Sequence, residues 1–98
     1  MELAQLTTEM HRFVESQGWY RPESPKPQTP RNLAMSLTIE AGEVLELFQW
    51  TDEPASREAL SGELADVALY LLQLASVSGI DLEQSILSKL RHNYSRTW

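Results

Sequence analysis

The sequence predicts an all-α domain built from four helices. Helix-forming residues dominate its 98 positions, apolar residues recur at helical spacing, and the alternation of Val, Ile and Thr that is typical of strands is missing. Prolines and glycines divide the chain into four such segments. The length suits a single domain over residues 1–98, with one modest core.

Composition and charge limit the classes of function. The hydrophobic share of 42% argues against disorder, and the lack of cysteine excludes disulfides and Cys-ligated zinc. The net charge of −6 argues against binding a nucleic acid polymer, but a small phosphorylated ligand is compatible if a metal ion inverts the local field. No secretory signal opens the chain, and no apolar run reaches the length of a membrane span. We therefore expect a cytoplasmic protein that binds no membrane.

The first predicted helix covers residues 2–17 and stops at Gly18. Its apolar face comprises Leu3, Leu6, Met10, Phe13 and Val14. His11 lies beside this face, and a single histidine in such a place is more often a surface residue than a ligand. In the loop of residues 18–30, GWYRPESPKPQTP, the prolines forbid a continuous helix. The two aromatic residues at the start of the loop either pin it to the core or line a ligand pocket.

The second predicted helix has Thr29 as its cap and Pro30 at its first position, and runs to about Trp50. Its apolar face comprises Leu33, Leu37, Ala41, Val44, Leu45 and Phe48. Glu40 and Glu43 lie one turn apart on another face, and Trp50 lies two turns beyond Glu43.

The third predicted helix is the one around which the chain is organised. Its stretch 61–75, SGELADVALYLLQLA, is apolar almost all the way round and belongs in the middle of a bundle. The exceptions lie on one stripe about 80° wide, and they are Glu63, Asp66, Tyr70 and Gln73. Buried carboxylates are costly unless they are paired, protonated or bound to a metal. The two acids therefore indicate either a site or ordinary surface acids on a half-exposed helix.

The fourth predicted helix starts at Asp81, which resembles a capping box with Gln84. Its core side comprises Ile86, Leu87 and Leu90. Lys89, Asn93 and Arg96 share another face. Taken alone, that trio is more typical of a solvated helix end, where cations are favourable, than of a binding site.

The second and third helices each carry two acids three residues apart, Glu40 with Glu43 and Glu63 with Asp66. If these helices pack antiparallel across the short turn at 51–56, the two pairs converge. Four converging carboxylates repel one another, and a hard divalent cation removes that conflict. A ligand set of oxygens alone predicts Mg²⁺, with Mn²⁺ as the alternative.

This pattern resembles a known family. The paired acids look like the ExxE…ExxD signature of the MazG-like all-α nucleoside triphosphate pyrophosphohydrolases. The sequences of Pro30–Trp50 and Glu63–Ala75, and the tail SKLRHNYSR, resemble those of the small dCTP pyrophosphatase branch. The resemblance covers nearly the whole chain. It implies a four-helix-bundle-like MazG fold, completed by oligomerisation, and Mg²⁺-dependent cleavage of a (d)NTP to a (d)NMP and diphosphate. The implied role is house-cleaning of dCTP-like or non-canonical deoxynucleotides.

The resemblance also implies roles for particular residues. The magnesium-binding and catalytic acids would be Glu40, Glu43, Glu63 and Asp66. The substrate-binding residues would be Trp19, Asn32, Trp50, Tyr70, Lys89, Asn93 and Arg96. Of these, the two tryptophans would pack on the base, and the residues of the fourth helix would lie near the phosphates. Relatives of this kind assemble as dimers or tetramers, and a central helix that is apolar all round independently favours a homo-oligomer.

Two departures from the family pattern leave the preferred base open. Met10 stands where the dCTP branch tends to carry a histidine, and the chain ends Thr97-Trp98 where the family often has Tyr-Pro. A substrate such as dUTP, or a broad set of NTPs, is therefore a second possibility. A non-catalytic helical module that binds nucleotides or a protein is the alternative from another class. The intact set of four acids argues against that module.

Overall fold

The computed structural model describes residues 1–98 as four α-helices without a strand, which confirms the predicted all-α class. The helices are α1 (Leu3–Ser16), α2 (Pro30–Glu46), α3 (Arg57–Val77) and α4 (Leu82–Tyr94). The predicted limits of the first, third and fourth helices agree with the structure to within a few residues.

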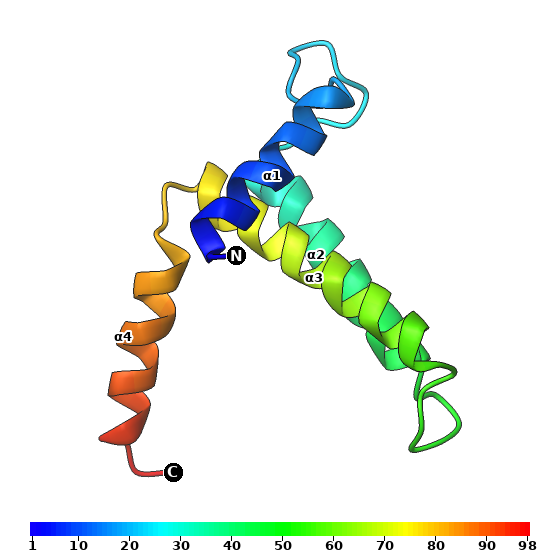
Figure 1. Ribbon diagram of the computed structural model, residues 1–98, viewed down its shortest axis with the longest axis vertical. Helices are drawn as coiled ribbons and strands as arrows, with labels where there is room; N and C mark the ends of the chain where they lie inside the picture. Colours follow the sequence, from blue (N-terminus) through cyan, green and yellow to red (C-terminus); the bar gives the residue numbers. More distant parts are fainter.

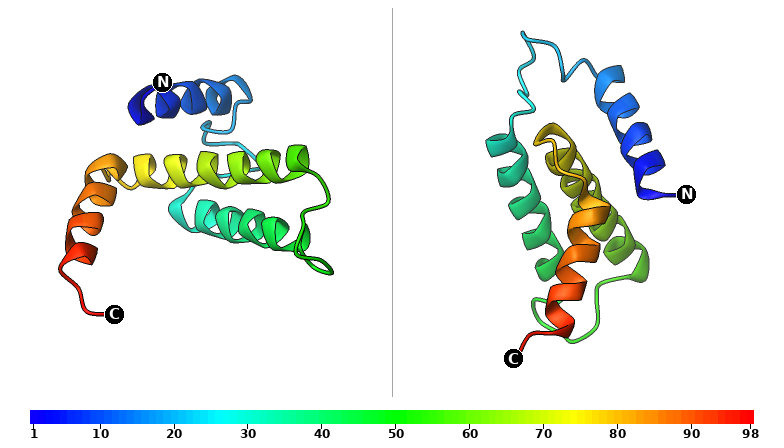
Figure 2. Two further views of the ribbon diagram at one scale, coloured as in Figure 1. Left: turned by 60° about the horizontal axis from the view of Figure 1, so that its bottom comes forward. Right: turned by 90° about the vertical axis from the view of Figure 1, so that its left-hand side faces the viewer.

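The helices are arranged around α3. It lies between α1 and α2, and it pairs with α2 in an antiparallel hairpin (Figures 1 and 2). At the carboxyl end of α3 the chain turns, and α4 projects away from the other three helices (Figure 1). The central position predicted for the apolar third helix is therefore found, whereas α4 does not complete a bundle within one chain.

Local signals define most of the helix ends. The side chains of Thr29, Ser56 and Asp81 each accept a hydrogen bond from the backbone N–H three residues further on, at 3.2, 2.9 and 3.1 Å. Gly18 and Gly79 follow α1 and α3 with positive φ angles of 75° and 69°. Only glycine adopts that conformation readily, so these two residues end the helices as predicted.

The end of α2 differs from the prediction. The helix stops at Glu46 rather than near Trp50, because the backbone then closes three tighter hydrogen bonds between residues three apart. The N–H groups of Leu47, Phe48 and Gln49 donate to the carbonyls of Val44, Leu45 and Glu46. The chain must reverse here to run antiparallel into α3. Trp50 lies in this reversal with 87% of its surface exposed, so it does not continue the face of Glu43.

The core is small and lies where the first three helices meet. Only six of the 98 residues are buried, namely Met10, Val14, Leu33, Leu72, Gln73 and Ala75. The predicted core side of α4 is not buried in this chain, since Ile86, Leu87 and Leu90 are 42–50% exposed. No other part of the chain packs along α4, so its apolar face has nothing to cover it.

By length and composition alone, α3 is long and apolar enough to cross a membrane. The expectation that no apolar run reaches that length is therefore wrong for this helix. The central helix of a bundle has the same composition, so the finding by itself is weak support for a membrane span. Glu63 and Asp66 lie within α3, where carboxylates would be costly in a bilayer.

Candidate functional site

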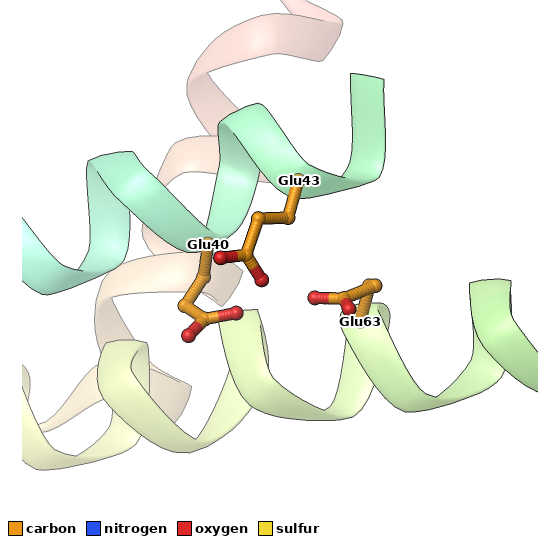
Figure 3. Close-up of side chains that lie close together, drawn as sticks. All are labelled: Glu40, Glu43 and Glu63. Carbon is orange, nitrogen blue, oxygen red and sulfur yellow. The ribbon is translucent and has the colours of Figure 1, made fainter. Parts of the chain in front are cut away.

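Three carboxylates converge between α2 and α3. Glu40 and Glu43 project from α2 toward Glu63 on α3 (Figure 3). One carboxylate oxygen from each residue lies within 4.8 Å of the others. The spacing of three residues puts the first two side chains on one face of α2, and the antiparallel hairpin brings the third opposite them. The convergence predicted from the sequence is therefore present for these three acids.

The surroundings of this cluster disfavour the negatively charged forms of two of its glutamates. The pKa of Glu40 is raised to about 7, mainly because burial disfavours its charged form and then because Glu43 lies beside it. The pKa of Glu63 is raised as well, first by its contact with the carboxyl group of Glu43 and then by burial. One oxygen each of Glu40 and Glu63 is buried without a hydrogen-bond partner. Such oxygens require a proton or a cation.

The fourth acid, Asp66, lies at the edge of this cluster. It is exposed and does not belong to the group of mutually close oxygens. Its negative charge still contributes to raising the pKa of both Glu40 and Glu63. Asp66 follows Glu63 by one turn of α3, on the side that faces a pocket.

That pocket has a volume of about 690 Å³ and is enclosed by α1, α2, α3 and the loop between α1 and α2. More than half of its lining residues are hydrophobic. Asp66 and Tyr70 contribute to its wall from α3, and Ser36 and Asn32 contribute from α2. Because Asp66 belongs to this wall and acts electrostatically on the three glutamates, the pocket and the acid cluster form one continuous site.

The loop supplies another part of the pocket wall through Trp19. Its ring packs edge-to-face against Phe13, with 5.6 Å between centroids, and the amine of Lys26 lies 4.8 Å from the ring centroid. Asn32 also lines the pocket, and its side-chain N–H donates to the carbonyl of Pro27 at 3.0 Å. Asn32 therefore anchors the loop in addition to facing the pocket.

Tyr20 and His11 have structural roles in this chain. The Tyr20 hydroxyl lies 2.6 Å from His11 Nδ1, and His11 Nε2 lies 2.7 Å from the hydroxyl of Ser76 on α3. Of the two alternatives for the aromatic residues of the loop, Trp19 lines the pocket and Tyr20 pins the loop. The expectation that His11 is a surface residue is wrong, because it is half-buried and both of its ring nitrogens are hydrogen-bonded, one to the loop and one to α3.

The remaining predicted substrate residues are not brought to the pocket within one chain. Trp50 is exposed in the turn between α2 and α3, and Lys89 and Asn93 lie on the projecting α4. Arg96 lies beyond the end of α4, with its guanidinium 3.9 Å from the ring centroid of Trp98, so it does not continue the helical face of Lys89. The carboxamide oxygen of Asn93 is buried without a partner.

Among the polar residues of the pocket wall that sequence reasoning missed are Lys26, Gln28 and Gln73. The first two lie in a proline-rich loop, where no periodic pattern predicts which side chains turn inward. Gln73 does carry a signal, because it shares the polar stripe of an otherwise apolar helix with the acids and Tyr70.

Comparison with known proteins identifies the family to which this sequence and fold belong. The sequence profile of the MazG-like family matches residues 35–97, which include all four acids. The chain belongs to the MazG-like family. A crystal structure of a pyrophosphatase from Archaeoglobus fulgidus, 33% identical in sequence, superposes with a TM-score of 0.80 over 93% of this chain and 87% of that one. The MazG-like assignment thus agrees at the level of both sequence and fold.

Among curated relatives, this MazG-like chain is 42% identical to dCTP pyrophosphatase 1 of Mus musculus and to dCTP pyrophosphatase 1 of Homo sapiens, over 76 residues in each case. The match covers 68% of this chain and 45% of each relative. The chain therefore spans less than half the length of the curated relatives that it matches.

Proposed function

We propose that this chain is a Mg²⁺-dependent nucleoside triphosphate pyrophosphohydrolase that converts a (d)NTP and water to a (d)NMP and diphosphate. The observation that carries the proposal is the continuity of the acid cluster with the mostly apolar pocket through Asp66. A nucleotide has an apolar, flat end and a polyanionic end, and the two parts of the site match these ends. Membership of the MazG-like family supports the same function.

The residues present fit a hard divalent cation. Glu40, Glu43 and Glu63 offer oxygen ligands only, and two of these oxygens are buried without a partner. Mg²⁺ suits this donor set, and Mn²⁺ is the alternative. When bound there, the ion supplies positive charge that neutralises triphosphate oxygens. Asp66 would complete the ligand set from the pocket side.

The other residues of the pocket bind and orient the substrate in this proposal. Trp19 presents a flat apolar surface on which a base stacks, and Tyr70 lies on the same wall beside Asp66. Because apolar side chains exclude water around the base, the scissile phosphates are left as the solvated end, next to the acids. The pocket thereby sets the direction in which the nucleotide lies.

For the substrate, we propose dCTP or a related deoxynucleotide with a modified base, removed as a house-cleaning activity. The support is the 42% identity to proteins named dCTP pyrophosphatase 1. A non-catalytic module that binds nucleotides or a protein is the alternative, and the convergent glutamates argue against it. A binding module has no need for buried carboxylates whose charged forms are disfavoured.

We further propose that the chain acts as a homo-oligomer, a dimer or a tetramer. The support is the small buried core and the exposed apolar face of α4, formed by Ile86, Leu87 and Leu90. A second subunit would cover this face. It would also allow Trp50, Lys89, Asn93 and Arg96, which one chain leaves away from the pocket, to reach the site of a neighbour.

The test is a titration of the protein with Mg²⁺ and a panel of dNTPs and NTPs, with release of diphosphate and monophosphate as the readout. We expect equal amounts of both products, dependence on the metal, and the highest kcat/KM for dCTP or a modified analogue. Nucleotide binding without diphosphate release at any metal concentration would favour the non-catalytic module. Cleavage of a different base with higher kcat/KM would correct only the substrate.

A further inference from the structure

Gln73 is the only polar residue in the buried core, with 3% of its surface exposed. It lies two turns beyond Asp66 on the polar stripe of α3, and it contributes to the wall of the pocket. Burial of a carboxamide is costly unless its polar atoms are hydrogen-bonded, and a leucine at this position would pack at a lower cost. The hydrogen bonds of Gln73 therefore indicate a role for this residue beyond packing in the core.

Both hydrogen bonds that the Gln73 side chain makes lead to the loop between α1 and α2. Its Nε2 donates to Gln28 Oε1 at 2.7 Å and to the Tyr20 hydroxyl at 3.3 Å. Burial raises the pKa of Tyr20, so this hydroxyl keeps its proton. The Tyr20 hydroxyl in turn contacts His11, which contacts Ser76 on α3. The start and the end of the loop are thus fastened to the same helix.

The loop has its own ties at the end that Gln73 reaches. Gln28 donates from its side chain to the carbonyl of Lys26 at 2.7 Å, and Asn32 donates to the carbonyl of Pro27 at 3.0 Å. These bonds shape the segment 26–28 but fasten it only to itself and to the start of α2. Gln73 is the residue that connects this segment to α3, two turns along the helix from Asp66.

We propose that Gln73 is a positioning residue for base recognition. Through Gln28 and Tyr20 it holds the loop so that Trp19 and the segment 26–28 form one wall of the pocket. The inference rests on the proposed function, because it assigns the base to this pocket. It predicts that loss of the Gln73 carboxamide weakens nucleotide binding while the acid cluster, which lies nearer the amino end of α3, is left intact.

The test compares wild type with Gln73→Leu, which keeps the approximate size of the side chain and removes its donors. We expect KM for the preferred dNTP to rise roughly 5- to 50-fold, the range for a lost buried hydrogen bond. We expect kcat to stay within about twofold, since the acids do not contact Gln73. The rise in melting temperature on addition of Mg²⁺, and inhibition by inorganic tripolyphosphate, which has no base, should be unchanged.

Two further variants separate positioning from stability. Leu72→Ala removes a buried side chain that does not line the pocket, so it should lower the melting temperature and leave KM unchanged. Gln28→Ala breaks the same connection from the less buried side, and it should raise KM as Gln73→Leu does even if the latter folds poorly. In the double variant the two effects on KM should not add in full, because either single variant already removes the hydrogen bond between Gln73 and Gln28.

The outcomes distinguish this inference from the proposed function. If wild type hydrolyses a dNTP but Gln28→Ala and Gln73→Leu keep its KM, the inference is overturned and the enzyme stands. If KM rises equally in Leu72→Ala, Gln73 has only a structural role and the inference is again overturned. If wild type neither binds nor cleaves any nucleotide, the proposed function fails first and the inference fails with it.

Discussion

The α2–α3 hairpin and α4 are helical segments of similar regularity, yet they differ in what one chain does with them. The hairpin contributes Leu33 and Leu72 to the core and brings three carboxylates together, whereas no residue of α4 is buried. A short turn holds α2 against α3, so their facing residues meet at high effective concentration. No such constraint holds α4, which leaves the other helices after Gly79 (Figure 2).

The same two regions differ in charge. The hairpin concentrates acids whose charged forms are disfavoured, while α4 carries Lys89, Arg91 and His92 toward its carboxyl end, where cations are favourable. The comparison suggests that metal binding is a property of the single chain and that contacts with the phosphates depend on assembly. Variants in the hairpin and in α4 should therefore have different effects.

The largest effect is expected from Glu40→Gln in the hairpin. We expect hydrolysis to fall by roughly 10²- to 10³-fold, the scale for removing one preorganised electrostatic group from a site. The melting temperature without metal should stay the same or rise, because a repelled charge is removed, and the gain on adding Mg²⁺ should be mostly lost. Thermal melts and diphosphate release measure both.

Glu46→Gln is the matched control, since Glu46 is an exposed acid on the same helix outside the cluster. It should keep wild-type hydrolysis and the full response to Mg²⁺. If Glu40→Gln behaved like this control, the three converging glutamates would be ordinary acids of a helix pair.

The next effect concerns α4. Leu90→Glu places a charge in its exposed apolar face, so the assembly should dissociate toward a species of 11.2 kDa, as measured by sedimentation. Hydrolysis should fall, but the stabilisation by Mg²⁺ should persist, because the hairpin supplies the metal ligands. Ser88→Glu puts the same charge on the opposite side of α4 and should change neither mass nor activity. An active wild-type protein of 11.2 kDa would refute the division.

A smaller effect is expected for the two tryptophans. Trp19→Ala should weaken nucleotide binding by about 1–3 kcal/mol, the scale of base–aromatic stacking, because Trp19 lines the pocket of its own chain. Trp50→Ala should have an effect only in the assembled protein, since Trp50 is exposed and outside that pocket. Calorimetric binding in the wild-type and Leu90→Glu backgrounds separates the two cases. Equal losses from Trp50→Ala in both backgrounds would place Trp50 in its own site.

The smallest effect is a pH dependence of stability. The pKa of Glu40 is about 7 in the folded chain against an ordinary value of 4.5, so the folded state binds this proton more tightly. The resulting stabilisation is fully present below pH 4.5 and is lost as the pH rises through about 7. Metal-free melting temperatures should therefore fall over this range, and less so in Glu40→Gln. A melting temperature that does not change with pH in wild type would show that the pKa of Glu40 is not raised in the folded chain.

Sequence by itself determined the features that depend on residues within about one helical turn of each other. The caps at Thr29, Ser56 and Asp81 and the glycine stops follow from local backbone chemistry, so the helices were predictable. The convergence of the glutamates was predictable too, because it needs only a spacing of three residues and a short turn between antiparallel helices.

Tertiary structure alone decided the features that depend on distant segments. Trp50 leaves the face of Glu43 because the chain must reverse before α3, and Asp66 borders the pocket because the loop and α1 close over that side of α3. Gln73 acquires its hydrogen bonds from residues 45 and 53 positions away along the chain. The direction of α4 could not be predicted from periodicity, because an apolar stripe specifies that a face is to be covered but not by which surface.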